Sequence, residues 1–276
     1  MKLKIITFCI LIVAILGSCK KEDLSNGLDT GKTTSNGTPL LTKVLIDNQS
    51  ANEYVYNDSN LLSEEKSKFD FIINNYNSNG QLTSSEYFGN DNVLSSDPSV
   101  YQAAMSSAVW VTETTGVCGG SMSYSYNDKG QLIKTTYIRS QSTTSEYSDF
   151  TYDANSRIGR QTMYWDNVAT GYIDYTYDAK GNLIQEMLYN LPSTGVGELI
   201  TTTQYEFDSQ KNPFVSTGRL MIPGINTNQN NIIKETYTIH LTADQGSDNV
   251  QVTQTAYTYN AVGYPITKNS NISFVY

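Results

Sequence analysis

Hydrophobic and polar residues alternate along most of this chain, in short runs that are separated by turn residues. In one run, Met122, Tyr124 and Tyr126 alternate with three serines. Such alternation places the two kinds of side chain on opposite faces of a strand, which is typical of a half-buried antiparallel sheet. The pattern therefore predicts an all-β protein. The predicted strands are 41–46, 69–73, 81–88, 121–126, 131–138, 146–152, 161–165, 172–177, 182–189, 201–207, 235–242 and 250–259.

One stretch near the middle of the chain shows the repeating unit of these runs most clearly. Tyr175 and Tyr177 lie two residues apart, so both rings point to one face of a strand. Asp178 can accept hydrogen bonds from backbone N–H groups two residues on, which starts a turn. Gly181 follows where a type I turn closed by a bulge needs a positive φ. Because Leu183 then begins a return strand, the unit is a β-hairpin corner.

The same unit recurs with variations. Its second aromatic residue falls at positions 56, 76, 126, 152, 177, 207 and 259, which fits a basic spacing of about 25 residues and indicates one supersecondary unit laid beside the next. We therefore expect a meander of sequential antiparallel hairpins that forms a curved, open barrel-like or sandwich sheet. Its Tyr, Leu and Ile face must be buried, so the sheet has to curl, pair with a second sheet or be covered.

Two copies, 124–132 and 175–183, resemble the YD repeat of the RHS family. The resemblance extends over roughly residues 54–265, although the copies at Tyr152 and Phe207 lack the glycine. It implies β-hairpins that wrap into long curved sheets, and carbohydrate binding has been proposed for some family members. The resemblance supplies no catalytic residues.

Three segments interrupt the pattern. Residues 89–120 form an insertion, in which Asp97, Pro98 and the helix formers up to Ala108 predict one short helix. The other two interruptions, 191–198 and 217–231, are rich in Gly, Pro, Asn or Thr. Loops on a rigid scaffold often carry function.

The N-terminus predicts export. Two lysines precede a 12-residue apolar run, Ile5–Leu16, which is too short to span a bilayer and suits a signal peptide. The following Leu-Gly-Ser-Cys resembles a bacterial lipobox, which implies cleavage before Cys19 and acylation of that residue. The alternative is an ordinary signal peptide with an incidental cysteine.

A tether should follow the cysteine. Residues 20–23, Lys-Lys-Glu-Asp, resemble the export signal of Bacteroidetes surface lipoproteins, although a solvated charge run is the alternative. The next residues are rich in Ser, Thr, Asn and Gly and cannot bury enough apolar surface to fold. We therefore divide the chain into a signal peptide (1–18), a lipidated cysteine with a flexible tether (19–40) and a single β domain (41–276).

Charge and composition exclude several kinds of chemistry. The formal net charge of −9 argues against nucleic acid as a partner. After signal cleavage and lipidation only Cys118 remains as a thiol, and His240 is the sole histidine, which disfavours thiol catalysis and His-rich metal sites. One aspartate per corner does not supply the six oxygens that calcium needs. We therefore predict no catalytic residues, no metal and no cofactor.

A glycan hydrolase is the lesser alternative. Such enzymes need two carboxylates that face each other across a cleft, and the chain has several carboxylates. No spacing singles out a pair. The available carboxylates are Glu113, Glu146, Asp149, Asp166, Asp174 and Glu186.

Aromatic residues are the remaining candidates for a ligand site. Rings on a β-face can stack on sugars, and the polar tips of Tyr and Trp suit wet interfaces. The alternative is that they pack across strands and hold the sheet. The candidate ligand-binding residues are Trp110, Tyr164, Trp165 and Tyr172.

These observations favour a non-enzymatic outer-membrane lipoprotein, exposed on the cell surface, that contacts the membrane through its N-terminal lipid and binds a glycan or a protein partner. The alternative is a periplasm-facing structural lipoprotein or a carrier of lipids or lipoproteins. A concave face of Leu, Ile, Val and Met would favour the carrier. A groove of Trp and Tyr among Asn, Gln and Asp would favour the binding protein.

Overall fold

The structure, a computed structural model, describes residues 37–67, 70–89, 117–139, 144–218, 222–242 and 246–276. These residues belong to one unit, Gly31–Tyr276. They form seventeen strands and one 3₁₀ helix, η1 (Pro213–Thr217). No helix in the described ranges is long and apolar enough to cross a membrane. The predicted helix at 97–108 lies outside the described residues.

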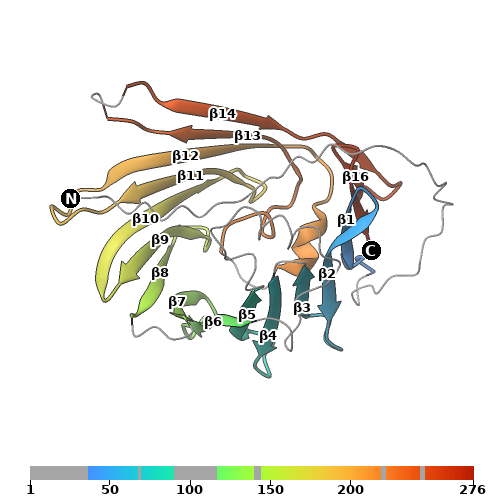
Figure 1. Cartoon of the computed structure of the whole chain (residues 1–276), viewed down its shortest axis with the longest axis horizontal. Helices are drawn as coiled ribbons and strands as arrows, with labels where there is room; N and C mark the ends of the chain where they lie inside the picture. The colour runs from blue at the N-terminus through green and yellow to red at the C-terminus, as the bar shows by residue number, and fades with distance from the viewer. Residues whose placement is uncertain (1–36, 68–69, 90–116, 140–143, 219–221, 243–245) are drawn as a thin grey trace. The chain divides into compact units, whose positions relative to one another are not determined.

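The strands follow one another in chain order, and nearly all pair antiparallel with the next (Figure 1). The last strand pairs with the first. Their bounds are β1 (Lys43–Ile46), β2 (Gln49–Tyr56), β3 (Leu62–Ser67), β4 (Asp70–Tyr76), β5 (Leu82–Gly89), β6 (Val117–Tyr126), β7 (Leu132–Arg139), β8 (Glu146–Tyr152), β9 (Ile158–Trp165), β10 (Val168–Tyr177), β11 (Leu183–Asn190), β12 (Glu198–Phe207), β13 (Ile232–Ile239), β14 (Asn249–Gln254), β15 (Tyr257–Tyr259), β16 (Pro265–Lys268) and β17 (Ile272–Val275).

The sheet stays open between β14 and β15. These strands are consecutive parts of one extended segment, in which β14 pairs with β13 and β15 pairs with β16. Between them, the Thr255 N–H donates to the carbonyl of Ile233, and the carbonyl of Ala256 accepts from the N–H of Asn269. The predicted all-β meander, forming one open sheet, is confirmed.

An Asn or Asp side chain builds each hairpin corner. Asp178 Oδ1 accepts from the N–H groups of Lys180 and Asn182, both at 2.8 Å. The Gly181 N–H donates to the Asp178 carbonyl, and the Asp178 N–H donates to the Asn182 carbonyl. This is a type I turn closed by a bulge, as predicted. The same pair of side-chain bonds is made by Asn57, Asn77, Asn127, Asp153 and Asn260.

The fourth residue of a corner has a left-handed backbone. At Gly181 φ is 91°, which glycine adopts without strain. The corner after Tyr152 has no glycine, and Ser156 takes the position with φ at 61°. For a residue with a Cβ, this conformation costs about 1–2 kcal/mol.

Replacing Ser156 with glycine should therefore stabilise the protein by about 1 kcal/mol, because the strain relieved exceeds the extra entropy that glycine has in the unfolded chain. The midpoint of urea unfolding should rise. Ser156→Ala keeps the Cβ and should give no such gain. Equal midpoints for the two variants would contradict the left-handed geometry of this corner.

A second irregularity beside each corner bends the sheet. Tyr177 is opposite Leu183, but Thr176 is opposite Gln185, so the ladder skips Ile184. A bulge bends the strand that carries it and increases its twist, so a bulge repeated at every corner curves the sheet. The equivalent skipped residues are Ser63, Thr83, Ile133, Gly159, Ile233 and Ile266.

The second tyrosine of a corner ties its repeat to the preceding one. Tyr177 Oη donates to the carbonyl of Ile158 at 2.7 Å, and Ile158 begins the return strand of the previous corner. The same bond joins Tyr76 to Leu62, Tyr126 to Leu82 and Tyr152 to Leu132. All four accepting residues are at most 2% exposed. These repeat tyrosines therefore hold the sheet together, which confirms the packing interpretation for them.

The chain between β12 and β13 lies against the buried side of the sheet (Figure 1). In η1, Phe214 packs edge-on against Phe274 of β17, with ring centroids 5.9 Å apart. Farther along, Asn228 Oδ1 accepts from the N–H of Leu183 at 2.7 Å. The described residues of the interruption predicted at 217–231, namely 217–218 and 222–231, thus belong to the packing of the interior.

Candidate ligand-binding face

Four tyrosines lie on the side of the sheet that faces away from the buried cluster. Ile173 on β10 packs into that cluster, so its neighbour Tyr172 points to the opposite face. Phe150 on β8 is buried in the same cluster, so Tyr147, three residues earlier, also points outward. Each has a tyrosine opposite it on the next strand. We call this set, with two adjacent cations, the tyrosine face: Lys134, Tyr147, Arg160, Tyr164, Tyr172 and Tyr189.

The tyrosines form two stacks across strands. The rings of Tyr147 and Tyr164 are 4.5 Å apart between centroids, with 9° between their planes. The rings of Tyr172 and Tyr189 are 4.6 Å apart, with 16° between their planes. Such aromatic pairs contribute about 0.5–1.5 kcal/mol beyond their buried area. The stacks occupy β8 to β11, four successive strands.

A cation covers one side of each stack. Lys134 Nζ lies 3.6 Å from the ring centroid of Tyr147, and Arg160 Cζ lies 4.0 Å from that of Tyr172. These distances are typical of cation–π contacts. Asp174 accepts two hydrogen bonds from Arg160, at 2.5 and 2.8 Å, and raises the pKa of the guanidinium. The rings are therefore held in place before any ligand arrives.

The other side of the first stack has a small neighbour. On β10 the residue opposite Tyr164 is Ala169, whose side chain ends at Cβ. A flat group can therefore approach the ring of Tyr164 from that side. Burial and the negative charge of Asp149 raise the pKa of Tyr164. Like any tyrosine hydroxyl at neutral pH, it is protonated and can donate a hydrogen bond.

The loop 191–198, one of the predicted interruptions, borders the second stack. A Cβ added to Gly197 would collide with the hydroxyl end of Tyr172. Only glycine lets this loop approach the ring so closely.

The structure separates the candidates that the sequence groups together. Tyr164 and Tyr172 share the tyrosine face. Trp165 is 39% exposed but points to the opposite side, because it follows Tyr164 directly on β9 and is opposite Glu146. Trp110 lies outside the described residues. Sequence reasoning missed Tyr147 and Tyr189, although counting strand register outward from the corners would have found both.

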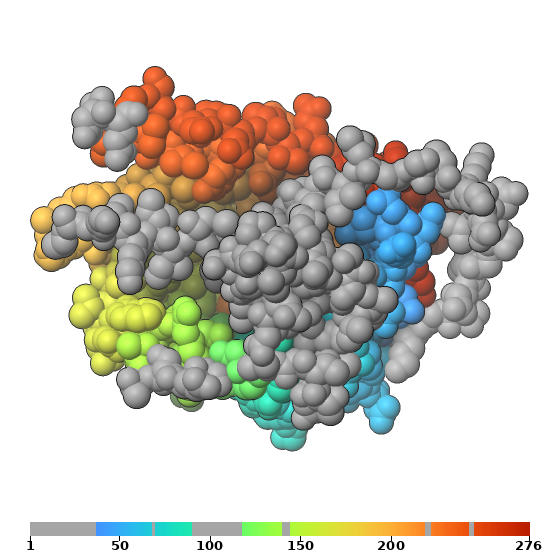
Figure 2. All heavy atoms as spheres, viewed as in Figure 1, coloured from blue at the N-terminus to red at the C-terminus, as the bar shows by residue number. Residues whose placement is uncertain are grey.

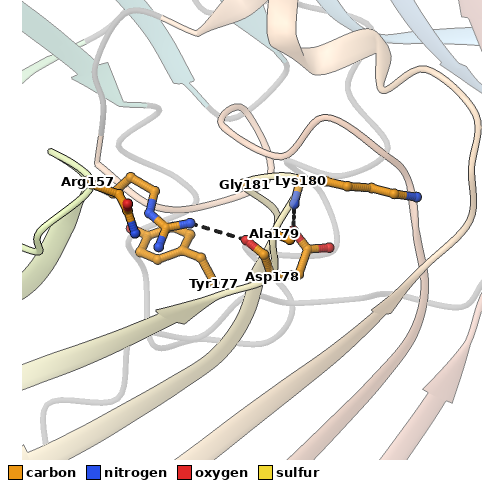
Figure 3. Close-up of a pocket in the computed structure, with 7 residues that line it drawn as sticks. Arg157, Tyr177, Asp178, Ala179, Lys180 and Gly181 are labelled. Carbon is orange, nitrogen blue, oxygen red and sulfur yellow. Dashed lines mark hydrogen bonds between the residues drawn. The ribbon is translucent and has the colours of Figure 1, made fainter.

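An open hollow of about 510 Å³ lies between two neighbouring corners (Figure 3). Arg157 spans it: the guanidinium lies 4.5 Å from the ring centroid of Tyr177 and donates to Asp153 Oδ2 and to the carbonyl of Asp178. Burial alone would raise the pKa of Asp153, but hydrogen bonds from Arg157 and Asn155 bring it below its usual value. The hollow therefore lies where two repeats meet, and Arg157 already bonds to both of them.

Most of the carboxylates that a hydrolase could use have other partners. Glu146 pairs with Arg139 at 2.7 Å, and Asp174 with Arg160. Glu186, on the buried side, accepts from Tyr205 Oη at 2.9 Å, and its pKa is raised by burial and then by Glu235. In the described ranges no three His, Cys, Asp or Glu residues are grouped as a metal site. Glu113 lies outside those ranges.

His240 bridges two neighbours. Its Nε2 lies 2.8 Å from Thr202 Oγ1, and its Nδ1 lies 2.8 Å from Asp248 Oδ2. The other oxygen of Asp248 accepts from the N–H of Leu241. These bonds brace the base of the hairpin that joins β13 to β14. Cys118 is exposed on β6, opposite Phe88.

No protein-family model and no curated protein matches the chain. Among solved structures, a porin-like protein from Bacteroides vulgatus ATCC 8482 is 12% identical, with 86% of this chain and 98% of that chain covered and a TM-score of 0.39. A DUF3836 family protein from Parabacteroides distasonis ATCC 8503 is 13% identical, over 39% of this chain and 91% of that chain, with a TM-score of 0.25. TcdB2-TccC3 is 14% identical, over 88% of this chain and 12% of that chain, with a TM-score of 0.28. Similarities at this level assign neither a family nor a function.

Proposed function

We propose that this chain is a non-enzymatic, lipid-anchored cell-surface protein that binds a glycan on its tyrosine face. The observation that carries the proposal is the pair of braced tyrosine stacks on the outer side of the sheet. Sugar rings have apolar faces that stack on aromatic rings, while their hydroxyl groups need polar partners. The tyrosine hydroxyls and Asp149 supply such partners beside the first stack.

Rigidity favours this use of the rings. In each stack the two rings pack against each other across strands, and a cation packs on one of them. Binding therefore orders few additional side chains and loses little conformational entropy. The carrier alternative lacks such support. The apolar side of the sheet is packed by the chain's own residues, among them Phe214 in η1, which cover part of the face that a carrier would need.

Binding should depend on Tyr164 and not on its neighbour Trp165. Tyr164→Ala removes the ring that has an accessible side. We expect glycan affinity to fall about five- to 150-fold, if a sugar face gains as much by stacking as the roughly 1–3 kcal/mol that a flat base gains on an aromatic side chain. Trp165→Ala is a matched control, because it also removes an exposed aromatic side chain but on the opposite face. Wild-type protein and both variants would be applied to an array of purified polysaccharides, and affinities measured by calorimetry for the glycans retained.

Equal losses in the two variants would contradict the tyrosine face as the site, and no retention of any polysaccharide by the wild type would contradict glycan binding. Tyrosine and arginine are also enriched at protein interfaces. A wild-type chain that ignores the array but captures a purified host protein, with the same dependence on Tyr164, would replace the glycan with a protein partner.

The anchor is tested separately. Cys19→Ser should release the chain from the membrane fraction, because only acyl chains are proposed to hold it there. Protease added to intact cells should remove the wild-type chain while a periplasmic control protein survives. Protection until the outer membrane is broken would contradict surface display and favour the periplasm-facing role.

A further inference from the structure

Strand β14 is an unprotected edge of the sheet. All six of its residues are exposed, and among the described strands it pairs with β13 alone. Figure 1 shows β14 as the outermost strand, and in Figure 2 the atoms of the β13–β14 region form the upper rim of the molecule. A strand edge in this state offers a row of N–H and C=O groups to another strand.

The hydrogen bonds show which backbone groups point outward. Because the Thr255 N–H donates to Ile233 on β13, and successive residues of an antiparallel strand direct these groups to opposite sides, alternate residues of β14 point away from β13. The next outward residue along the chain is Ala256, whose N–H and C=O both bond to Asn269. These two bonds occupy the outward backbone groups of Ala256 alone. The outward residues before it are Val250, Val252 and Gln254.

The side chains of β14 lack the usual defences of an edge. Val250 is 56% exposed and Val252 is 55% exposed. The strand reads Asn-Val-Gln-Val-Thr-Gln, without a charge or a proline, whereas natural edges commonly carry lysine or proline to prevent pairing. Because the chain has a net charge of −9, this neutral edge is a place where two copies can approach with little repulsion.

We propose that β14 pairs antiparallel with β14 of a second copy of this chain, in a register centred on Gln251. A two-fold axis there makes the contact self-complementary. It places Val250 of each copy opposite Val252 of the other, and pairs of β-branched residues are favourable across strands. The two valine pairs exchange four backbone hydrogen bonds. The partner strand then stops short of Ala256, whose outward groups are already bonded.

The edge is ordered before it binds. His240 joins Thr202 on β12 to Asp248, the residue just before β14, so pairing orders little additional backbone. Five paired residues bury far less than the roughly 1,200 Å² of a standard stable interface. The contact is therefore weak in dilute solution, and the proposed membrane tether strengthens it by raising the local concentration.

A disulfide tests the register. The two copies of Gln251 form a non-hydrogen-bonded pair with Cα atoms about 4.5 Å apart, within the range that a disulfide spans. Gln251→Cys, in the full chain with Cys118→Ser and expressed in its host, should yield under mild oxidation of intact cells a band at twice the mass of the chain. Val262→Cys, at a residue that is 60% exposed away from β14, should yield at least about fivefold less.

Adding Val252→Lys to the Gln251→Cys chain should reduce the dimer to the level of the Val262→Cys control, because lysine on an edge opposes pairing. Val262→Lys, in the same background, should leave it intact. Dimer in equal amounts for both cysteine positions, or none for either, would overturn the proposal. A Gln251→Cys band at another mass would show that a foreign strand occupies the edge, which also overturns pairing between copies.

Discussion

Leu132→Ala should destabilise the protein by about 3 kcal/mol, whereas Ile133→Ala should cost less than about 1 kcal/mol. Leu132 is 2% exposed in the main buried cluster, and its carbonyl accepts a hydrogen bond from the hydroxyl of Tyr152. Leucine-to-alanine changes at such sites cost about 2–5 kcal/mol, because they lose apolar contacts and leave a cavity. Ile133 is the skipped bulge residue, is 40% exposed and faces water.

The two variants remove similar side chains from adjacent positions, so their difference reports which of the two residues faces the buried cluster. Urea unfolding of each variant beside the wild type would measure it, with the slope of each transition checked for a constant unfolded state. Equal destabilisation would contradict the opposite burial of these two residues. The same comparison can be repeated at Leu183 and Ile184, where Leu183 is 1% exposed.

The corners could be predicted from the sequence because their interactions are local. Asp178 bonds to residues two and four positions later, and those contacts form whatever the rest of the chain does. The turn also tolerates the loss of its glycine, since Ser156 adopts the left-handed backbone. Turn building is thus the role that the structure shows for Asp178 and Asp153.

Other strands could not be recognised because neighbours determine them. Strand β3 reads Leu-Ser-Glu-Glu-Lys-Ser, and only Leu62 and Ser67 are buried. It is a strand because it pairs with both β2 and β4. Its own sequence has no alternating pattern that would predict this pairing. The single strand predicted at 250–259 is divided for a similar reason, since its two halves pair with different partners.

The candidate site was recognised only in half. Tyr164 and Tyr172 stand out in the sequence as aromatics beside one turn, but their stacking partners lie on β8 and β11, the strands on either side of that turn's hairpin. Which tyrosines meet is decided by the register between strands, and each corner bulge shifts that register by one residue. The opposite orientation of Trp165, in contrast, follows from simple alternation along β9.

The same register places Gly171 against the backbone of Tyr189, one of the stacked tyrosines. Gly171 is buried on β10, and a Cβ there would lie 2.6 Å from the carbonyl oxygen of Tyr189 and 3.2 Å from Cε of Met163. Since a backbone atom cannot give way as a side-chain tip can, Gly171→Ala should force β11 away from β10. We expect a loss of about 2–3 kcal/mol of stability, typical of overpacking.

The change should also reach the proposed binding site. Moving the backbone of Tyr189 separates its ring from Tyr172, so the near-ultraviolet circular dichroism of the tyrosines should weaken in the folded variant, and glycan affinity should fall with it. Gly89→Ala is the matched control, because a Cβ at that strand position meets nothing within 4 Å, and its stability should stay within about 0.5 kcal/mol of the wild type. A Gly171→Ala protein with unchanged stability and an unchanged tyrosine signal would show that β10 and β11 are not so close. If instead stability falls while the signal and the affinity persist, the second stack is held by Arg160 and the loop at Gly197 rather than by the strand pairing beneath it.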